Sequence, residues 1–199
     1  MERCTVFWIL CALLRTSLAF NVDTENHVVH SGPTSSKFGF TVKQFVNQEG
    51  KWLVIGAPEA ETSQTGVYRP GVVYKCRAQN PSECYVIPFD TTGNNQEWNG
   101  YAYIQTENKT QQWLGATLST SSDNGAIVAC APRYVYFSRK GDKREPIGMC
   151  YVSAPDMDTQ KFTPCKHYYD LTGGGELQKG DSIESFKLIM GPQASKVIE

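Results

Sequence analysis

The fold of this chain is decided by three short apolar runs, Phe38-Gly39-Phe40-Thr41-Val42, Trp52-Leu53-Val54-Ile55-Gly56-Ala57-Pro58 and Gly71-Val72-Val73-Tyr74-Lys75-Cys76. Their β-branched and aromatic residues are separated by glycine, proline and polar segments. This pattern is typical of short antiparallel strands joined by tight turns. Residues 38–76 therefore predict a small antiparallel sheet.

The same pattern returns further along the chain, in Trp113-Leu114-Gly115-Ala116-Thr117-Leu118, Ile127-Val128-Ala129-Cys130-Ala131-Pro132 and Ile147-Gly148-Met149-Cys150-Tyr151-Val152. The two Ala-Pro dipeptides lie about 70 residues apart, which is long for a propeller blade unless loops are inserted. A weaker third copy falls within residues 183–199. No segment has sustained helical periodicity, so the prediction is an all-β fold of repeated sheets, with repeats at about 38–76, 113–152 and 183–199.

Composition sets broad limits on function. The chain has 199 residues, enough for one domain with a real core. Its formal net charge is −1, so it carries no overall basic charge of the kind that binds nucleic acid or an anionic membrane.

The first residues predict a secretory signal peptide over 1–19. A short polar start precedes an apolar run over residues 5–14, and Ser17-Leu18-Ala19 has the small residues of a cleavage site. The alternative, a signal anchor, is disfavoured because the run is too short to span a bilayer. The mature fold is expected over residues 20–199, and Val28-Val29-His30 predicts an edge strand near its start.

Secretion makes disulfides the expected state of the cysteines. Of the seven, two leave with the signal peptide. Proximity in sequence predicts the pairs Cys76 with Cys84 and Cys130 with Cys150, which leaves Cys165 unpaired. A zinc site is the competing interpretation, but no Cys-x-x-Cys or His-x-x-x-His spacing supports it.

Several short motifs were weighed as sites. Asn108-Lys109-Thr110 is a permissible N-glycosylation sequon, whereas proline blocks Asn80-Pro81-Ser82. Lys140-Gly141-Asp142 and Lys179-Gly180-Asp181 resemble adhesion tripeptides, but exposed turns are the simpler interpretation.

An enzyme is not expected. The three histidines, His27, His30 and His167, have no acidic, serine or cysteine partner in motif spacing. No nucleophile elbow, phosphate loop or zinc helix occurs, so no catalytic residue is predicted.

The ordered motifs resemble those of integrin α subunits. Besides the repeats, the resemblance includes Phe20-Asn21-Val22-Asp23, Phe89-Asp90-Thr91-Thr92-Gly93-Asn94 and Arg144-Glu145-Pro146-Ile147-Gly148-Met149-Cys150. The resemblance covers residues 20–165. It is strongest to the subunits that lack an inserted domain, and among those to the group that binds Arg-Gly-Asp ligands. It implies that this chain forms a partial β-propeller, namely the first two blades and a remnant of the third blade of a seven-bladed propeller.

The resemblance also bears on metal and cysteine chemistry. The family's calcium loops, written Asp-x-Asp-x-Asp-Gly, sit in later blades, so no cofactor or metal is expected in this fragment. Asp156-x-Asp158, in a predicted loop over residues 153–164, is too short to be one. The family cysteine that matches Cys165 pairs with one shortly downstream, which is absent here.

One contact carries over by position. In the family, aromatic rings at the propeller's upper mouth hold a basic side chain of the β subunit by cation–π attraction, and Phe40 and Trp113 match such positions. Lys37 stands where a related subunit has an aromatic residue. The alternative is that both rings are core residues of their strands.

The function implied by the resemblance is that of a cell-adhesion receptor. The chain would be the N-terminal part of an integrin α subunit that pairs with a β subunit, binds extracellular-matrix proteins and reaches the cell surface by the secretory pathway. The alternative is a truncated secreted isoform with a structural or decoy role. No transmembrane segment and no nucleic-acid partner are expected in this chain.

Overall fold

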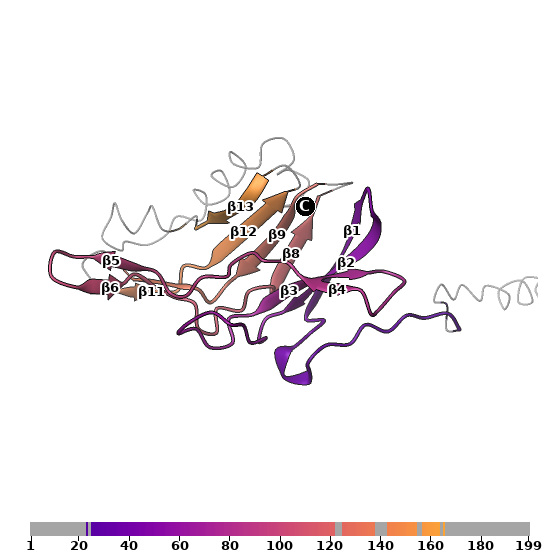
Figure 1. Cartoon of the computed structure of the whole chain (residues 1–199), viewed down its shortest axis with the longest axis horizontal. Coiled ribbons are helices and arrows are strands. Elements are labelled where there is room, and N and C mark those ends of the chain that lie inside the picture. The colour runs from indigo at the N-terminus through magenta and orange to yellow at the C-terminus, as the bar shows by residue number, and fades with distance from the viewer. Residues whose placement is uncertain are drawn as a thin grey trace, which may run out of the picture.

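The computed structural model describes residue 23 and residues 25–121, 125–137, 143–154, 157–163 and 165. Two four-stranded antiparallel sheets lie side by side and form most of this part of the chain (Figure 1). The all-β, antiparallel prediction is confirmed. The described sheets close no ring, so the propeller stays a prediction.

The first sheet follows the chain in the order β1-β2-β3-β4. Its strands are β1 (Thr41–Asn47), β2 (Gly50–Ala57), β3 (Val72–Arg77) and β4 (Cys84–Val86). Cys76 and Cys84 stand directly opposite each other on β3 and β4 and form a disulfide. The bond fixes the short outer strand to the sheet.

The second sheet repeats this plan in the order β8-β9-β12-β13. Its strands are β8 (Thr117–Thr120), β9 (Ile127–Ala131), β12 (Met149–Ala154) and β13 (Met157–Phe162). Cys130 and Cys150 again face each other across two paired strands and form a disulfide. Both pairs expected from the sequence are therefore present.

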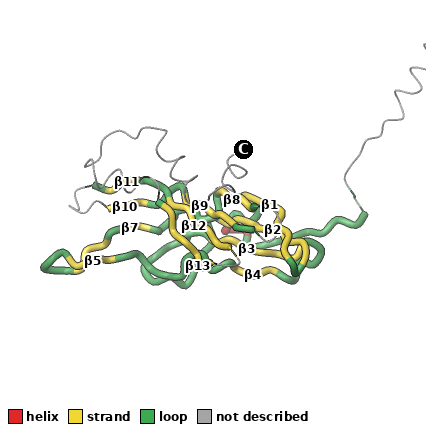
Figure 2. The backbone as a smooth tube through the Cα atoms, turned by 90° about the horizontal axis from the view of Figure 1, so that it is seen from above, coloured by secondary structure: helices red, strands yellow, loops and turns green. Residues whose placement is uncertain are grey.

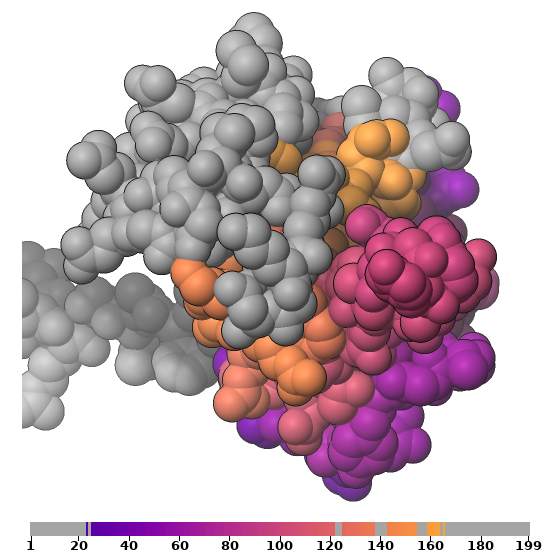
Figure 3. Space-filling model, turned by 90° about the vertical axis from the view of Figure 1, so that its left-hand side faces the viewer, coloured from indigo at the N-terminus to yellow at the C-terminus, as the bar shows by residue number. Residues whose placement is uncertain are grey.

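Smaller elements connect and flank these sheets. They are the 3-10 helix η1 (Thr34–Ser36), the hairpin β5 (Gln96–Trp98) with β6 (Tyr103–Gln105), and a small sheet of β7 (Glu107–Asn108), β10 (Val135–Phe137) and β11 (Arg144–Glu145). The hairpin and the small sheet lie at the end of the molecule away from β1 (Figure 2). The hairpin bulges from the surface there (Figure 3).

One apolar core lies between the two large sheets. The first sheet contributes Phe45, Trp52, Val54 and Val73, and the second contributes Leu118, Ile127, Ala129, Ala131, Met149 and Tyr151. Burial of each large apolar side chain contributes about 1.5–3 kcal/mol. The sheets are therefore held together by a shared core rather than by two separate ones.

Glycine permits the sheets to approach this closely. A Cβ atom at Gly56 would lie 2.0 Å from the carbonyl oxygen of Gly115, closer than real atoms can approach. Gly115 itself has φ +89°, a conformation that L side chains rarely adopt. The hydroxyl of Thr41 donates to the carbonyl oxygens of Gly115 and Ala116, at 2.7 and 2.8 Å, and ties the sheets together at this point.

Three predicted boundaries were wrong. Residues 27–33 form no strand in the described structure, because β propensity alone supplies no neighbouring strand to pair with. The predicted loop over 153–164 instead contains β13, whose polar residues are those of an exposed edge strand. The apolar run Tyr85-Val86-Ile87-Pro88-Phe89-Asp90 also predicts a strand over residues 85–90, but β4 ends at Val86. Residues 1–19 and 183–199 lie outside the described residues.

We expect Gly56→Ala to lower the free energy of unfolding by about 1–3 kcal/mol or more, because the added methyl group forces the two backbones apart. Urea unfolding of the full chain, followed by tryptophan fluorescence, would measure this. Gly66→Ala is the control: its φ is +71°, but nothing lies within 4 Å of the added atom. A loss at Gly56 no larger than the loss at Gly66 would contradict the close approach.

Candidate functional site

The exposed ring of Phe40 and the half-buried ring of Trp113 form the centre of a candidate contact surface. Their rings meet edge to face, with centroids 5.6 Å apart. Phe40 is 51% exposed and Trp113 is half-buried, and neither ring belongs to the buried core cluster. The interpretation of Phe40 as a core residue was therefore wrong, and a β-subunit contact at either ring stays a prediction. The surrounding residues complete what we call the Trp113 cluster: Lys37, Phe40, Glu59, Arg69, Trp113 and Arg133.

Tight turns bring these side chains together. Lys37 has φ +55° and its carbonyl accepts a hydrogen bond from the backbone N–H of Phe40, so one turn presents both residues. Trp113 has φ +64° and opens the turn that leads to β8. Arg133 follows β9, and its backbone N–H donates to the carbonyl of Gln112. Segments far apart in sequence thus meet at one ring.

Cations of the same chain already lie over the indole. The Lys37 ammonium is 4.7 Å from the Trp113 ring centroid, and the Arg133 guanidinium carbon is also 4.7 Å from it. Glu59 pairs with Lys37 at 2.6 Å and with Arg69 at 2.9 Å. The hydrogen bond from Lys37 is the main cause that lowers the pKa of Glu59 below its ordinary value. This carboxylate is therefore ionised at neutral pH.

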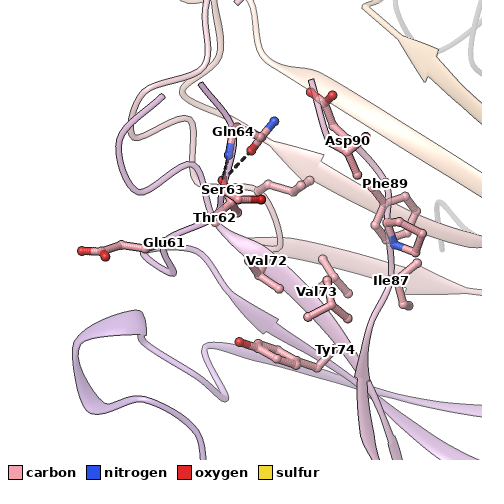
Figure 4. Close-up of a pocket in the computed structure, with 15 residues that line it drawn as sticks. Glu61, Thr62, Ser63, Gln64, Val72, Val73, Tyr74, Ile87, Phe89 and Asp90 are labelled. Carbon is pink, nitrogen blue, oxygen red and sulfur yellow. Dashed lines mark hydrogen bonds between the residues drawn. The ribbon is translucent and has the colours of Figure 1, made fainter. Parts of the chain in front are cut away.

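A pocket of about 250 Å³ lies elsewhere, between the loop of residues 61–64 and the segment 86–91. Val73 lines it from β3, and Ile87, Phe89 and Asp90 line it from the segment that follows β4 (Figure 4). The side chain of Gln64 is engaged, since its amide nitrogen donates to the carbonyl of Thr92 and its oxygen accepts from Thr62. The pocket therefore presents no strong case for a ligand site.

A buried ionic network borders this pocket. The ammonium of Lys109, which is 0% exposed, lies 2.7 Å from Asp90 Oδ2 and 3.1 Å from Glu107 Oε1. Each carboxylate also accepts a hydrogen bond from a tyrosine hydroxyl, Asp90 from Tyr151 at 2.7 Å and Glu107 from Tyr134 at 2.6 Å. Buried charges paired in this way favour a structural role, because no reactant can reach them.

The pKa directions agree with this role. Burial alone would raise the pKa of Asp90, but hydrogen bonds from Lys109, Tyr151 and the Thr92 backbone outweigh it and hold the pKa below 3.8. Burial, reinforced by the neighbouring carboxylates, raises the pKa values of Tyr134 and Tyr151, so both hydroxyls stay protonated as donors. Since the pKa of Asp90 is lowered on folding, its stabilising contribution is present above pH 4 and is lost in acid.

Three further residues considered in the sequence, Asn108, His30 and Cys165, lie in the described part of the chain. Asn108 is half-buried on β7, and its side-chain oxygen accepts a hydrogen bond from the backbone of Thr110. His30 lies near Cys76 and Cys84, but these sulfurs are bonded to each other and are not thiolate ligands. Cys165 is a half-buried free thiol in the described part of the chain, and burial raises its pKa.

Some predicted sites lie outside the described residues, namely His167 and the tripeptides at 140–142 and 179–181. The side chains of the Asp156-x-Asp158 pair are also outside the description. Sequence reasoning in turn missed Glu59, Arg69, Arg133 and Lys109. Arg69 lies 10 residues from Glu59, Lys109 lies 19 from Asp90 and Arg133 lies 20 from Trp113, and no local motif indicates these contacts.

We expect Lys109→Met to lower the free energy of unfolding at pH 7 by about 3–5 kcal/mol, because Asp90 and Glu107 would remain buried without their cation. The loss should shrink near pH 4, where Asp90 without its cation can take up a proton. Urea unfolding at both pH values measures this, with Lys43→Met on the exposed part of β1 as control. Equal losses at the two pH values would exclude the ionic explanation.

Comparison with known proteins finds similarity to integrin alpha subunits of several animals. Integrin alpha-5 of Xenopus laevis is 36% identical over 200 residues, which cover 94% of this chain and 19% of the relative. Integrin alpha-8 of Homo sapiens is 36% identical over 186 residues, 89% of this chain and 17% of the relative. Integrin alpha-V of Gallus gallus is 37% identical over 191 residues, 92% of this chain and 18% of the relative. No family model matches the chain.

The chain spans less than a fifth of the length of these relatives. Their family consists of receptors rather than enzymes, in agreement with the expectation of no catalytic site. The two disulfides and this similarity indicate a protein of the secretory pathway or extracellular space. By homology over about nine-tenths of its length, this chain is related to the N-terminal region of integrin α subunits.

Proposed function

We propose that this chain is the N-terminal part of a cell-adhesion receptor, an integrin α subunit that pairs with a β subunit to bind extracellular-matrix ligands. The observation that carries the proposal is the similarity of nearly the whole chain to integrin α subunits from several animals. Ligand binding would be a property of the complete heterodimer, since these relatives are much longer than this chain.

The two large sheets would be the first two blades of a propeller. Each is a four-stranded antiparallel meander in chain order, which is the architecture of a propeller blade. Each carries one disulfide at a paired position, and the two share a single core. This agreement in plan supports an arrangement of repeated blades about an axis.

The β subunit would contact the Trp113 cluster. Aromatic residues dominate the binding energy of many protein interfaces, and an exposed Phe40 packed on a half-buried Trp113, both in fixed turns, is well suited to this role. Among the described residues, no helix is both long enough and apolar enough to cross a membrane. Membrane attachment is not part of the proposal for this stretch.

Co-expression tests the pairing directly. The full chain, with an affinity tag, would be produced together with an integrin β subunit and captured from the cell extract. We expect the β subunit to be captured with the wild-type chain. Trp113→Ala should lower the captured amount at least tenfold, because loss of a tryptophan that is an interface hot spot costs about 2 kcal/mol or more.

Trp98→Ala is the matched control, since Trp98 is an equally large exposed ring on the distant β5–β6 hairpin. Its variant should capture as much β subunit as the wild type. Failure of every β subunit tested to bind the wild-type chain would refute the pairing. It would favour the alternative of a secreted product with a structural or decoy role.

We also expect a glycan on Asn108. Asn108→Gln should increase the electrophoretic mobility of the chain made in animal cells, by the same amount as enzymatic removal of N-glycans. Asn80→Gln, in the sequence Asn80-Pro81-Ser82, should leave mobility unchanged because proline blocks that sequon. An unchanged mobility for Asn108→Gln would show that this asparagine is not modified.

A further inference from the structure

The first disulfide has a third metal-ligating side chain beside it. The sulfurs of Cys76 and Cys84 and a ring nitrogen of His30 all lie within 4.8 Å of one another. His30 belongs to the segment before β1 and is far from both cysteines in sequence, so no local motif indicates this grouping. Within the described ranges, no comparable group of three surrounds the second disulfide, that of Cys130 and Cys150.

The ring of His30 is held in the form that a metal ion requires. Its Nε2 lies 3.3 Å from the carbonyl oxygen of Ala78, and a carbonyl can only accept, so Nε2 carries the proton and Nδ1 has the lone pair. Nδ1 is buried and has no hydrogen-bond partner among the described residues. Histidines that bind metal ions commonly donate their other ring N–H to a backbone carbonyl in this way.

The backbone holds the two cysteines opposite each other independently of the disulfide. Their Cα atoms are 4.1 Å apart at a paired position of β3 and β4. On one side of this pair, the N–H of Arg77 donates to the carbonyl of Glu83 at 2.8 Å. On the other side, the N–H of Ile87 donates to the carbonyl of Val73 at 2.9 Å. The two thiols of a reduced chain would therefore stay together at this end of the sheet.

Two thiolates and one imidazole suit zinc. Zinc bonds are about 2.3 Å to sulfur and about 2.0–2.1 Å to nitrogen, so the ligand atoms of a tetrahedral site lie roughly 3.5–3.8 Å apart. His30 is no more than 4.8 Å from either sulfur. Side-chain rotations of the freed cysteines can supply the remaining adjustment. In other zinc sites with three protein ligands, a water molecule takes the fourth position.

We propose that the reduced form of this chain binds one zinc ion through Cys76, Cys84 and His30. The metal site and the disulfide are then alternative states of the same two cysteines. Binding of Zn²⁺ to the thiols of a newly made chain forms two Zn–S bonds and releases two protons. A disulfide of an oxidoreductase then takes two electrons from the two thiolates and two protons from solvent and becomes a dithiol, while the Cys76–Cys84 bond forms and zinc leaves.

The ion would have a structural role before oxidation. β4 is an outer strand of three residues, and the side chains of Tyr85 and Val86 on it are more than half exposed, so few buried contacts hold this strand. A metal ion bound to β3, β4 and the segment before β1 would fix all three until the disulfide replaces it. This proposal does not depend on pairing with a β subunit.

The wild-type full chain tests the proposal without any substitution. Its disulfides would be reduced by a phosphine, which becomes the phosphine oxide with oxygen from water, and the reductant would be removed under argon. Alkylation of each cysteine by iodoacetamide would be followed by mass spectrometry, with and without zinc. Zinc should slow alkylation of Cys76 and Cys84 about tenfold or more, and that of Cys130 and Cys150 by less than about twofold. Equal slowing of both pairs, or no slowing, would overturn the proposal.

Cobalt(II) would report the ligands by spectroscopy, because its absorption distinguishes thiolate ligands and tetrahedral coordination. The reduced wild type should bind Co²⁺ with both signatures, and zinc should displace it. The oxidised chain, which keeps the free thiol of Cys165, should show neither. His30→Ala should weaken Co²⁺ binding to the reduced chain about tenfold or more. His27→Ala, which removes an exposed histidine of the same segment, is the matched control and should bind like the wild type. Equal affinity of the two histidine variants would overturn the proposal.

Discussion

The approach of two backbones at Gly56 and Gly115 is the constraint on which the rest of the described structure depends. A Cβ atom at Gly56 has no room beside the Gly115 carbonyl, and the hydroxyl of Thr41 holds the junction from the first sheet. At this separation the facing side chains of the two sheets form one core. The interior is close-packed, so a wider separation would leave voids that the same side chains could not fill.

Two polar assemblies follow from this arrangement. Near the small β7–β10–β11 sheet, the ammonium of Lys109 pairs with the buried carboxylates of Asp90 and Glu107, which water cannot solvate. Two tyrosine hydroxyls donate further hydrogen bonds to these carboxylates. At the surface near the junction, turns from both sheets meet around Trp113. The first assembly is buried in the fold, and the second lies at its surface.

The Trp113 cluster shows why a residue's role cannot be carried over by position alone. The rings of Phe40 and Trp113 do pack against each other, with Phe40 exposed and Trp113 half-buried. Lys37 and Arg133 change the electrostatics of the same surface, because each brings a full positive charge to the ring.

The sequence by itself determined the all-β class, the two repeated sheets and both disulfides, because alternating apolar runs and neighbouring cysteines are local signals. It did not determine β13, whose polar residues match a loop until a neighbouring strand pairs with them. Only the tertiary structure decided that Lys109 is buried and that Arg133 lies over Trp113. The surroundings of a charged side chain are set by residues that are far away in the sequence and close in space. No local sequence pattern indicates which of those residues will be close.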